Sequence, residues 1–250
     1  MNRAFFRFYA ELNDFLDREL RFKRFEYPFH GKPSVKDVIE ALGVPHTEVD
    51  LVVVNGEVSS FGYNLKDGDF VAVYPVFESI DISGLKDEEP LREMKFVADV
   101  HLGRLARYLR ILGFDTLYKN DFSDEEIINI SNEQNRVVLT RDIGILKNGK
   151  VEKGYFVRNT KLSEQVEEVL ARFDLFSLIK PFDRCPLCNG KLSYVDKESI
   201  LDRLPPKTRR AFSEFKMCEN CGKIYWKGTH YKKIINFIEH LKAKHKTQGF

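Results

Sequence analysis

The sequence predicts a multidomain chain, with an α+β fold at its start, an α/β fold in its middle and a small cysteine-containing module near its end. Three patterns support this division. Residues 2–76 hold strand patterns around one helix, residues 95–142 alternate short apolar runs with amphipathic helical patterns, and two C-x-x-C pairs lie between positions 185 and 221. A chain of 250 residues, 43% of them hydrophobic, can build more than one core.

The N-terminal pattern consists of strands and one helix in the order ββαβββ. The expected strands are residues 2–10, 23–27, 51–54, 57–58 and 70–76, and the expected helix runs from Ser34 to Gly43. Asn55-Gly56 is a strong signal for a tight turn between two of these strands. His30 and His46 have no partner spacing and are expected at the surface or in turns. The order of elements is that of a ubiquitin-like β-grasp, which we assign to residues 1–82.

Residues 95–142 follow the order βαβαβ. Apolar residues recur at helical steps before Gly113, which supplies a helix stop: Leu102, Leu105, Ala106, Leu109 and Leu112. Arg104, Arg107 and Arg110 occupy the other faces of this helix. Ser123 and Glu126 have the spacing of a capping box, which predicts the start of the second helix.

Two strands of this unit are followed by aspartates, residues 96–98 by Asp99 and residues 137–140 by Arg141-Asp142. Because ligands of open parallel sheets bind beyond the carboxyl ends of the strands, we expect Asp99 and Asp142 in one cleft, with Asp124 from the second helix beside them. Such carboxylates suit Mg²⁺ or Mn²⁺. Each of these aspartates also has a structural alternative. An acid in the first turn of a helix is stabilised by the helix dipole, and an aspartate after a strand can cap a turn.

Asp121 and Glu125 flank Asp124, and the helix dipole explains them more simply than a metal does. The polar connection at residues 144–153 is expected at the rim of the cleft. A further strand at 154–158 and a covering helix from Leu162 to Phe173 complete an α/β domain at residues 95–182. The charged segment 83–94, which contains Gly and Pro, is the expected linker between the first two domains.

The four cysteines follow the pattern C-x₂-C-x₂₉-C-x₂-C at Cys185, Cys188, Cys218 and Cys221. The start of the chain lacks the apolar run of a signal peptide, so we expect a cytoplasmic protein in which these residues bind metal rather than form disulfides. Four thiolates close a tetrahedral Zn²⁺ site with no open position, and the glycine after each pair permits the turn. We therefore predict a structural zinc ribbon at residues 183–231, with an extra helix in the insert.

The charge of the chain is uneven. Residues 183–250 hold 15 Lys and Arg against 7 Asp and Glu, a net charge of +8, whereas residues 1–82 have a net charge of −5. Within the basic segment Lys223, Tyr225, Trp226 and Lys227 interleave aromatic and basic side chains, as single-strand binders do. Two alternatives are that the lysines form a solvated surface and that Tyr225 and Trp226 pack on the zinc knuckles.

The tail, residues 232–250, predicts an amphipathic helix with an apolar side of Ile234, Ile235, Ile238 and Leu241. We expect this helix to pack on the ribbon. Its apolar face is too small to favour membrane binding. No stretch of about 18 consecutive apolar residues is present, so no transmembrane helix is expected.

Several motifs occur together in one order, FVADVHLGRLARYLRILGFDTLY, SDEEI and VVLTRD. From about Lys95 to Trp226 the chain resembles the Mut-seven C-terminal RNase family, a PIN-like nuclease domain with a zinc ribbon. The resemblance implies a PIN-like α/β sandwich and metal-dependent RNA cleavage, with Asp99, Asp124 and Asp142 as the catalytic acids. Related proteins often have a second polar or acidic residue beside the first aspartate, where this chain has Val100-His101.

The phrases ALGVPHTEVDLVVVNGEV and LKDGDFVAVYPVF are similar to sulfur carriers and to the ubiquitin-like domain attached to these RNases. Sulfur carriers react through a free C-terminal Gly-Gly. Here the last strand continues into ESIDISGLKDEEP, so we expect no carrier chemistry. The first domain is therefore expected to dock a protein partner, to position RNA or to serve a structural role.

The sequence thus predicts hydrolysis of RNA phosphodiester bonds at a Mg²⁺ or Mn²⁺ site. Arg104 and Arg141 are candidates for phosphate contacts, with a structural ion pair as the alternative, and His101 could orient a water or RNA. A different class of function is an RNA-binding adaptor without turnover, which recruits partners through the β-grasp. A sulfur-transfer accessory protein is the third alternative, which the missing Gly-Gly disfavours.

Overall fold

The computed structural model describes residues 1–75 and 94–248. Their strands form three sheets, with the orders β2-β1-β5-β3-β4, β7-β6-β8-β9 and β10-β11-β12. These are a β-grasp sheet, a parallel α/β sheet and a small antiparallel sheet with the four cysteines, so the predicted fold class is confirmed. By internal contacts the chain divides into two compact units, Met1–Glu93 with Asp121–Val157 and Met94–Asn120 with Arg158–Phe250. The predicted linker at 83–94 lies, except for Met94, outside the described residues.

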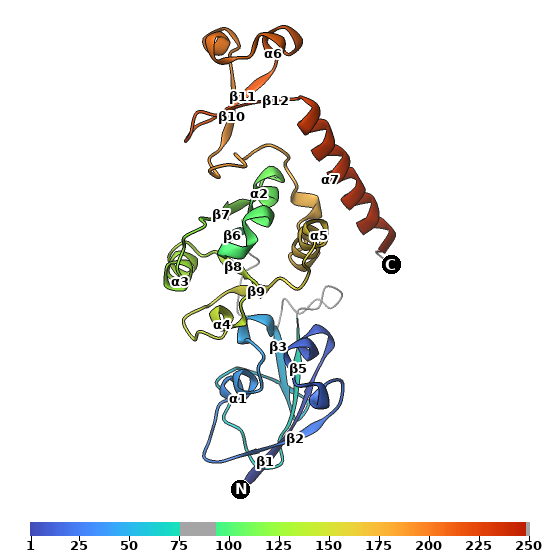
Figure 1. Cartoon of the computed structure of the whole chain (residues 1–250). Coiled ribbons are helices and arrows are strands. Elements are labelled where there is room, and N and C mark those ends of the chain that lie inside the picture. Colours follow the sequence, from blue (N-terminus) through green and yellow to red (C-terminus); the bar gives the residue numbers. More distant parts are fainter. Residues whose placement is uncertain (76–93, 249–250) are drawn as a thin grey trace. The chain divides into compact units, whose positions relative to one another are not determined.

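The first unit begins with the β-grasp domain (Figure 1). Its elements are β1 (Asn2–Phe8), η1 (Ala10–Phe15), η2 (Arg18–Leu20), β2 (Phe25–Phe29), α1 (Val35–Ala41), η3 (His46–Glu48), β3 (Leu51–Val54), β4 (Glu57–Ser59) and β5 (Phe70–Tyr74). The central strands β1 and β5 are parallel, and their outer neighbours are antiparallel. Ala4, Phe6 and Phe8 are buried, as the alternating pattern of the first strand predicts.

Local signals set the ends of these elements as expected. Ser34 caps α1 with a full capping box, and its hydroxyl and amide donate hydrogen bonds to Asp37, which lower the pKa of that carboxyl. Asn55 and Gly56 both have positive φ, 53° and 89°, between the antiparallel strands β3 and β4. Positive φ at both central residues is the requirement of a type I′ hairpin turn, which explains the Asn-Gly pair.

The same unit contains α3 (Asp124–Glu133), β8 (Val137–Thr140), α4 (Ile143–Leu146) and β9 (Gly154–Phe156). Ser123 forms the expected capping box with Glu126 at the start of α3. The connection after β8 differs from the expected polar rim. Residues 143–146 form a helix, and Ile145, Leu146 and Val151 are buried. Three apolar residues scattered over a short polar segment gave no periodic pattern, so only their tertiary packing reveals this element.

The β-grasp domain is joined to β9 through η3. The buried Glu48 accepts a hydrogen bond from the Phe156 amide through Oε1. His46 lies in the short turn η3, as one of its two expected positions, but it is buried rather than at the surface. Its Nδ1 lies 2.6 Å from Glu40 Oε1 and its Nε2 2.9 Å from the Val151 carbonyl oxygen. Phe15 packs edge-on against Phe156, with ring centroids 5.5 Å apart. This domain is therefore packed onto the edge of the α/β sheet by buried polar and aromatic contacts.

The second unit contains the remaining α/β elements and the ribbon. They are β6 (Lys95–Ala98), η5 (Val100–Leu102), α2 (Gly103–Ile111), β7 (Asp115–Leu117), α5 (Leu162–Arg172), η6 (Phe176–Leu178), β10 (Leu192–Val195), η7 (Glu198–Arg203), α6 (Pro206–Ala211), β11 (Phe215–Cys218), β12 (Ile224–Trp226) and α7 (Thr229–Gln248). The predicted apolar side of α2 is buried, as are Val166, Val169 and Leu170 of α5, whereas Leu162 and Phe173 are half-buried. The two helices pack together. The expected helix in the ribbon insert is present as η7 and α6.

The tail helix α7 does not pack chiefly on the ribbon, which corrects the expectation for residues 232–250. Phe237 contacts the Tyr108 ring of α2, with centroids 5.5 Å apart, and Lys244 Nζ lies 2.7 Å from Glu167 Oε2 of α5. In Figure 1 α7, drawn in red, runs alongside α5. Its apolar residues Ile238 and Leu241 are buried. An amphipathic face identifies a helix that must pack, but not its partner.

We predict that Glu48→Ala lowers the free energy of unfolding by about 1–3 kcal/mol, because it leaves the Phe156 amide at the sheet edge without its carboxylate acceptor. Glu57→Ala is the matched control, since Glu57 is an exposed residue of β4 in the same domain. Denaturant unfolding of the two variants and the wild type measures the difference. Equal losses in both variants would show that the Glu48 contact contributes no specific stability.

Candidate metal centre and nucleic-acid interface

The four cysteine side chains form the metal-ligating cluster of the described residues. Their Sγ atoms all lie within 4.8 Å of one another, with Cys185 Sγ 3.7 Å from Cys221 Sγ and Cys188 Sγ 3.4 Å from Cys218 Sγ. Tetrahedral Zn²⁺ with Zn–S bonds of about 2.3 Å requires S···S separations of about 3.8 Å. Cys185 and Cys218 are buried and Cys221 is exposed. Both the donor set and the spacing fit a closed structural zinc site.

The electrostatics of the cluster also favour a cation. Burial, together with hydrogen bonds with the neighbouring cysteine sulfurs, raises the pKa of the Cys188 thiol to about 12. At Cys185 burial also raises the pKa, but hydrogen bonds from the Tyr225 hydroxyl and the amides of Cys188 and Leu187 outweigh it and lower the pKa to about 7. Crowded thiols cannot all ionise without a compensating positive charge, which bound Zn²⁺ supplies.

Backbone conformation explains the two cysteine turns. Gly222 follows Cys221 with φ of 67°, as the glycine pattern predicts. In the first turn the residue with positive φ is Asn189, at 69°, and not Gly190. Gly190 has a different reason to lack a side chain, because a Cβ there would lie 2.7 Å from Asn220 Cγ. The two turns therefore approach each other closely around the cysteines.

The first cysteine turn is fixed to α2 and β7 by buried polar contacts that the sequence did not reveal. Arg110, expected on an outer face, is 5% exposed, and its guanidinium donates to the carbonyl oxygens of Thr116 at 2.7 Å and Leu187 at 3.0 Å. Asn189 accepts from the Thr116 amide at 3.0 Å and donates to Asp115 Oδ1 at 2.8 Å. The ribbon is therefore attached to α2 and β7 of its own unit by buried hydrogen bonds.

Asp99 follows β6 and lies at the start of η5. It is 2% exposed, and its Oδ1 accepts a hydrogen bond from the His101 amide at 3.2 Å. The turn after it depends on Gly103, where a Cβ would meet the Tyr118 ring and hydroxyl at 2.5 Å. Tyr118 packs there and donates to the Val100 carbonyl oxygen at 3.2 Å. This arrangement places the Asp99 carboxylate at the carboxyl end of β6.

Asp124 and Asp142 belong to the first unit. Asp142 follows β8 and caps α4, and its Oδ1 accepts from the Gly144 amide at 2.7 Å. Asp124 is exposed in the first turn of α3, as are Glu125 and, just before the helix, Asp121. The capping and first-turn roles considered from the sequence are thus present for Asp142 and Asp124, and both carboxylates are exposed to solvent.

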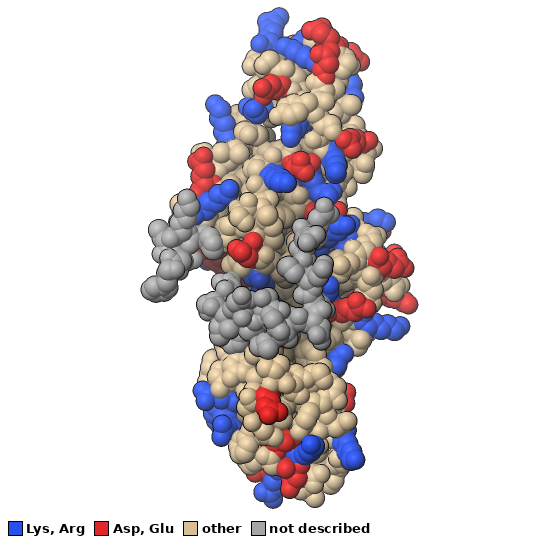
Figure 2. Space-filling model, turned by 180° about the vertical axis from the view of Figure 1, so that it is seen from behind, with Lys and Arg blue, Asp and Glu red and all other residues tan. Residues whose placement is uncertain are grey.

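The candidate phosphate contacts differ in their surroundings. Arg104 and His101 are exposed, Arg104 on α2 and His101 just before it. Arg141 is half-buried, and its Nη1 donates to the Val157 carbonyl oxygen at 2.8 Å, which links the end of β8 to the residue after β9. On the face drawn in Figure 2, Lys and Arg side chains are interspersed with Asp and Glu. The excess positive charge therefore does not form one continuous basic surface on this face.

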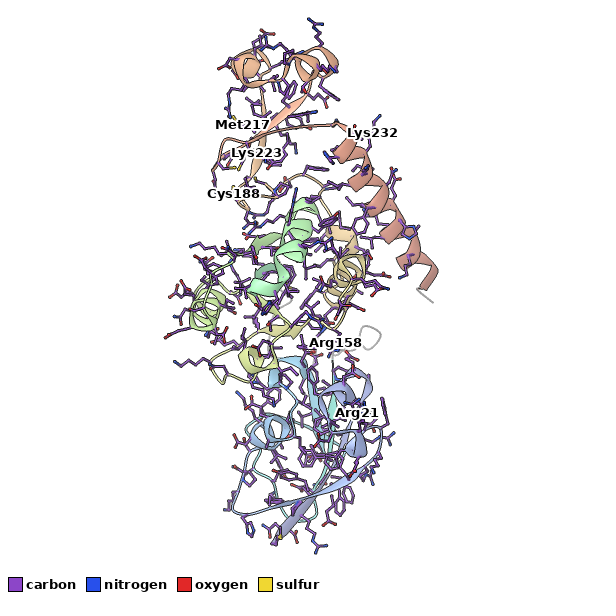
Figure 3. All side chains as sticks on the ribbon, in the orientation of Figure 1. Arg21, Arg158, Cys188, Met217, Lys223 and Lys232 are labelled. Atoms are coloured by element: carbon purple, nitrogen blue, oxygen red, sulfur yellow. The ribbon has the colours of Figure 1, made fainter. Side chains whose placement is uncertain are left out.

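The aromatic and basic candidates of the ribbon do not all lie together. Tyr225, Trp226 and Lys227 line a pocket, whereas Lys223 is exposed in the second cysteine turn, on the same part of the ribbon as Cys188 (Figure 3). Tyr225 and Trp226 also pack as the alternative predicted. The Tyr225 hydroxyl lies 3.0 Å from Cys185 Sγ, and Trp226 packs against Phe215 with ring centroids 6.4 Å apart. Burial raises the pKa of Tyr225, which keeps its hydroxyl as a donor.

Comparison with protein families identifies the chain. Residues 94–238 match the model of the Mut7-C RNAse domain. The chain belongs to the Mut7-C RNase family. Residues 1–81 match the Mut7-C ubiquitin model, so both parts of the resemblance found in the sequence are confirmed. Residues 94–238 therefore form a Mut7-C RNase domain, preceded by the Mut7-C ubiquitin-like domain.

We also compared the chain with solved structures and with curated proteins. The crystal structure of SAMP1 from Haloferax volcanii is similar to part of this chain. The match covers 32% of this chain and 100% of the SAMP1 chain, with 19% sequence identity and a TM-score of 0.26. No curated protein matches the chain. Among the described helices, none has the length and apolar character needed to cross a membrane.

We predict one zinc per chain in the purified Mut7-C protein and its loss in Cys185→Ser, because three thiolates and a neutral hydroxyl bind Zn²⁺ far more weakly than four thiolates. Leu187→Ser is the matched control, since Leu187 is 63% exposed in the same cysteine turn. Metal content measured by atomic spectroscopy decides the result. Zinc retained in Cys185→Ser, or absent from the wild type, would contradict the assignment of the ribbon.

Proposed function

We propose that this Mut7-C RNase domain hydrolyses RNA phosphodiester bonds at a Mg²⁺ or Mn²⁺ site formed by Asp99, Asp124 and Asp142. The observation that carries the proposal is the match of residues 94–238 to a ribonuclease family. Two acids support it, because Asp99 directly follows β6 and Asp142 directly follows β8, as the predicted βαβαβ order requires. In open α/β sheets the carboxyl ends of the strands are where ligands bind.

The donor set suits a hard divalent cation. Carboxylate oxygens are the ligands that Mg²⁺ and Mn²⁺ prefer. Asp99 is 2% exposed, and a buried carboxylate requires hydrogen bonds or positive charge to offset the loss of hydration. The exposed carboxylates of Asp124 and Asp142 leave room for water and for a phosphate. A bound ion would lower the pKa of a coordinated water and stabilise negative charge on the phosphate oxygens.

The chain's own side chains would hold the substrate. Arg104 is exposed one turn after Asp99 and can pair with a phosphate. Arg141 binds the Val157 carbonyl oxygen and precedes Asp142 directly, so we assign it to positioning that aspartate rather than to the phosphate. His101 is an exposed candidate to orient a water or the RNA.

The β-grasp domain would support the nuclease fold structurally. Glu48 and His46 bind the backbone of Phe156 and Val151, so these two buried side chains are not exposed to a partner. A protein partner would then have to bind elsewhere on the domain. The adaptor function without turnover remains the second candidate, favoured by Val100-His101 in place of a second acid beside Asp99.

We predict that Asp142→Asn lowers the rate of RNA cleavage by more than about 100-fold, since loss of mere outer-shell partners of metal sites typically costs 10–100-fold. Asp99→Asn should behave likewise. The double variant should be little slower than either single one, because ligands of one metal act as a unit. Cleavage of a mixed RNA pool with Mg²⁺, with Mn²⁺ and with chelator is the measurement.

Asp121→Asn is the matched control, because Asp121 is an exposed acid close in sequence to Asp124. It should keep near wild-type activity. Cleavage that survives in Asp142→Asn would contradict the proposed site. A wild type that binds RNA but cleaves none with either metal would favour the adaptor.

A further inference from the structure

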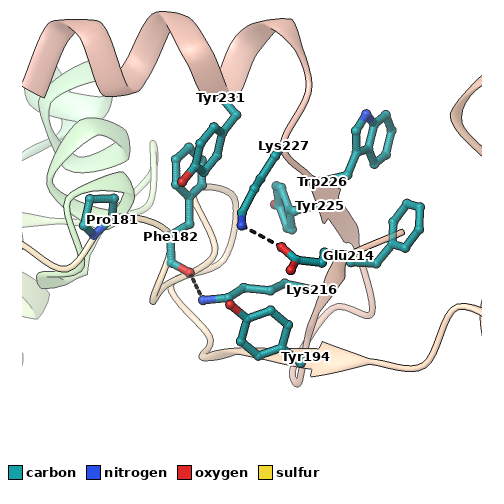
Figure 4. Close-up of a pocket in the computed structure, with 10 residues that line it drawn as sticks. Pro181, Phe182, Tyr194, Glu214, Lys216, Tyr225, Trp226, Lys227 and Tyr231 are labelled. Carbon is teal, nitrogen blue, oxygen red and sulfur yellow. Dashed lines mark hydrogen bonds and ion pairs between the residues drawn. The ribbon is translucent and has the colours of Figure 1, made fainter. Parts of the chain in front are cut away.

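The ribbon, the two residues before it and the start of α7 line an open pocket of about 180 Å³ (Figure 4). Its walls include the aromatic residues Phe182, Tyr194, Trp226 and Tyr231 and the cations Lys216 and Lys227. A cavity of about 150 Å³ can hold benzene, so this volume accommodates one aromatic ring system. All the lining residues belong to the second unit of the fold.

The aromatic rings provide a surface for stacking. Tyr194 is 71% exposed although it lies on a strand, and Phe182 and Tyr231 are stacked with centroids 4.7 Å apart and planes at 25°. Tyr194 therefore presents its ring to solvent at the pocket that it lines. An exposed ring beside aromatic walls offers a planar ligand a surface on which to stack.

The charged side chains that line the pocket are Lys216, Lys227 and Glu214. Lys216 Nζ lies 5.1 Å from the centre of the Tyr194 ring and donates to the Phe182 carbonyl oxygen at 2.9 Å. Lys227 Nζ pairs with Glu214 Oε2 at 2.6 Å, and both of these side chains are more than half exposed (Figure 4). Two ammonium groups thus flank the rings, and one carboxylate faces the same space.

We propose that this pocket binds one unstacked base of single-stranded RNA, with the adjoining phosphate held by Lys227 and Lys216. Aromatic stacking tolerates any base, and lysines at the rim neutralise the backbone, as in other single-strand sites. Glu214 holds Lys227 and can accept a hydrogen bond from an amino group of the base. A base paired in a duplex cannot enter, because its faces are covered by neighbouring bases.

The inference rests on RNA as the substrate of the nuclease domain, but its test does not need cleavage. Trp226 is the single tryptophan of the chain and lies in the pocket wall, so its fluorescence reports occupancy directly. We choose the full-length, zinc-loaded Asp142→Asn protein, which keeps the RNA intact. The titrants are an unstructured RNA oligonucleotide, a base-paired RNA of equal length and adenosine monophosphate.

The oligonucleotide should change the Trp226 emission, the duplex should not, and the mononucleotide should bind more weakly because it lacks the flanking backbone. Tyr194→Ala should weaken oligonucleotide binding by about 5- to 150-fold, the range of one base–aromatic stack. Tyr194→Phe keeps the ring and should bind as the parent does. Lys227→Ala should weaken binding and reduce its salt dependence, whereas Lys207→Ala, an exposed lysine of α6, should change neither.

Three outcomes would overturn the inference: no change of Trp226 emission with RNA, equal binding of the duplex, or unchanged affinity in Tyr194→Ala. Each of these leaves the nuclease proposal standing if the wild type cleaves RNA with Mg²⁺ or Mn²⁺. Conversely, RNA binding at Trp226 in a protein that cleaves nothing would support the pocket and reject the nuclease. A tighter response to the mononucleotide than to the oligonucleotide would assign the pocket to free nucleotides instead of RNA.

Discussion

The buried guanidinium of Arg110 joins the zinc ribbon to the α/β part of its unit. It lies on α2 and donates to carbonyl oxygens of β7 and of the first cysteine turn, and burial lowers its pKa. These carbonyl groups would lose their partner if the turn moved, and unpaired buried carbonyls are costly. Arg184, which pairs with Asp115 at 3.1 Å, and Asn189 add to the same junction. Zinc, by fixing the cysteine turn, should therefore also stabilise α2, whose start follows Asp99.

The β-grasp domain depends on a second junction of the same kind. Glu48 and His46 bring a buried carboxylate and a buried imidazole to the backbone around β9. Unpaired amides of an edge strand invite association with other chains, and covering them prevents this. A ubiquitin-like domain that serves as an edge cover needs no reactive tail.

The sequence predicted the features that local signals determine. The capping boxes at Ser34 and Ser123, the Asn-Gly turn and the cysteine spacing each involve residues a few positions apart, and each was found as expected. The burial of His46 depends on Val151, 105 positions away, and that of Arg110 on Leu187, 77 positions away. Likewise Tyr194 and Lys216 meet Trp226 at the pocket only through the ribbon's tertiary fold, so no short motif could reveal them.

The chain would thus use two metals for different purposes, zinc on thiolates for structure and Mg²⁺ or Mn²⁺ on carboxylates for chemistry. Binding of Mn²⁺ to the zinc-loaded protein, followed by electron paramagnetic resonance, tests this division most directly. The wild type should bind Mn²⁺ and keep one zinc, and Asp99→Asn should lose Mn²⁺ affinity while its zinc content stays the same. Equal Mn²⁺ binding by both proteins, or displacement of zinc by Mn²⁺, would contradict a separate carboxylate site.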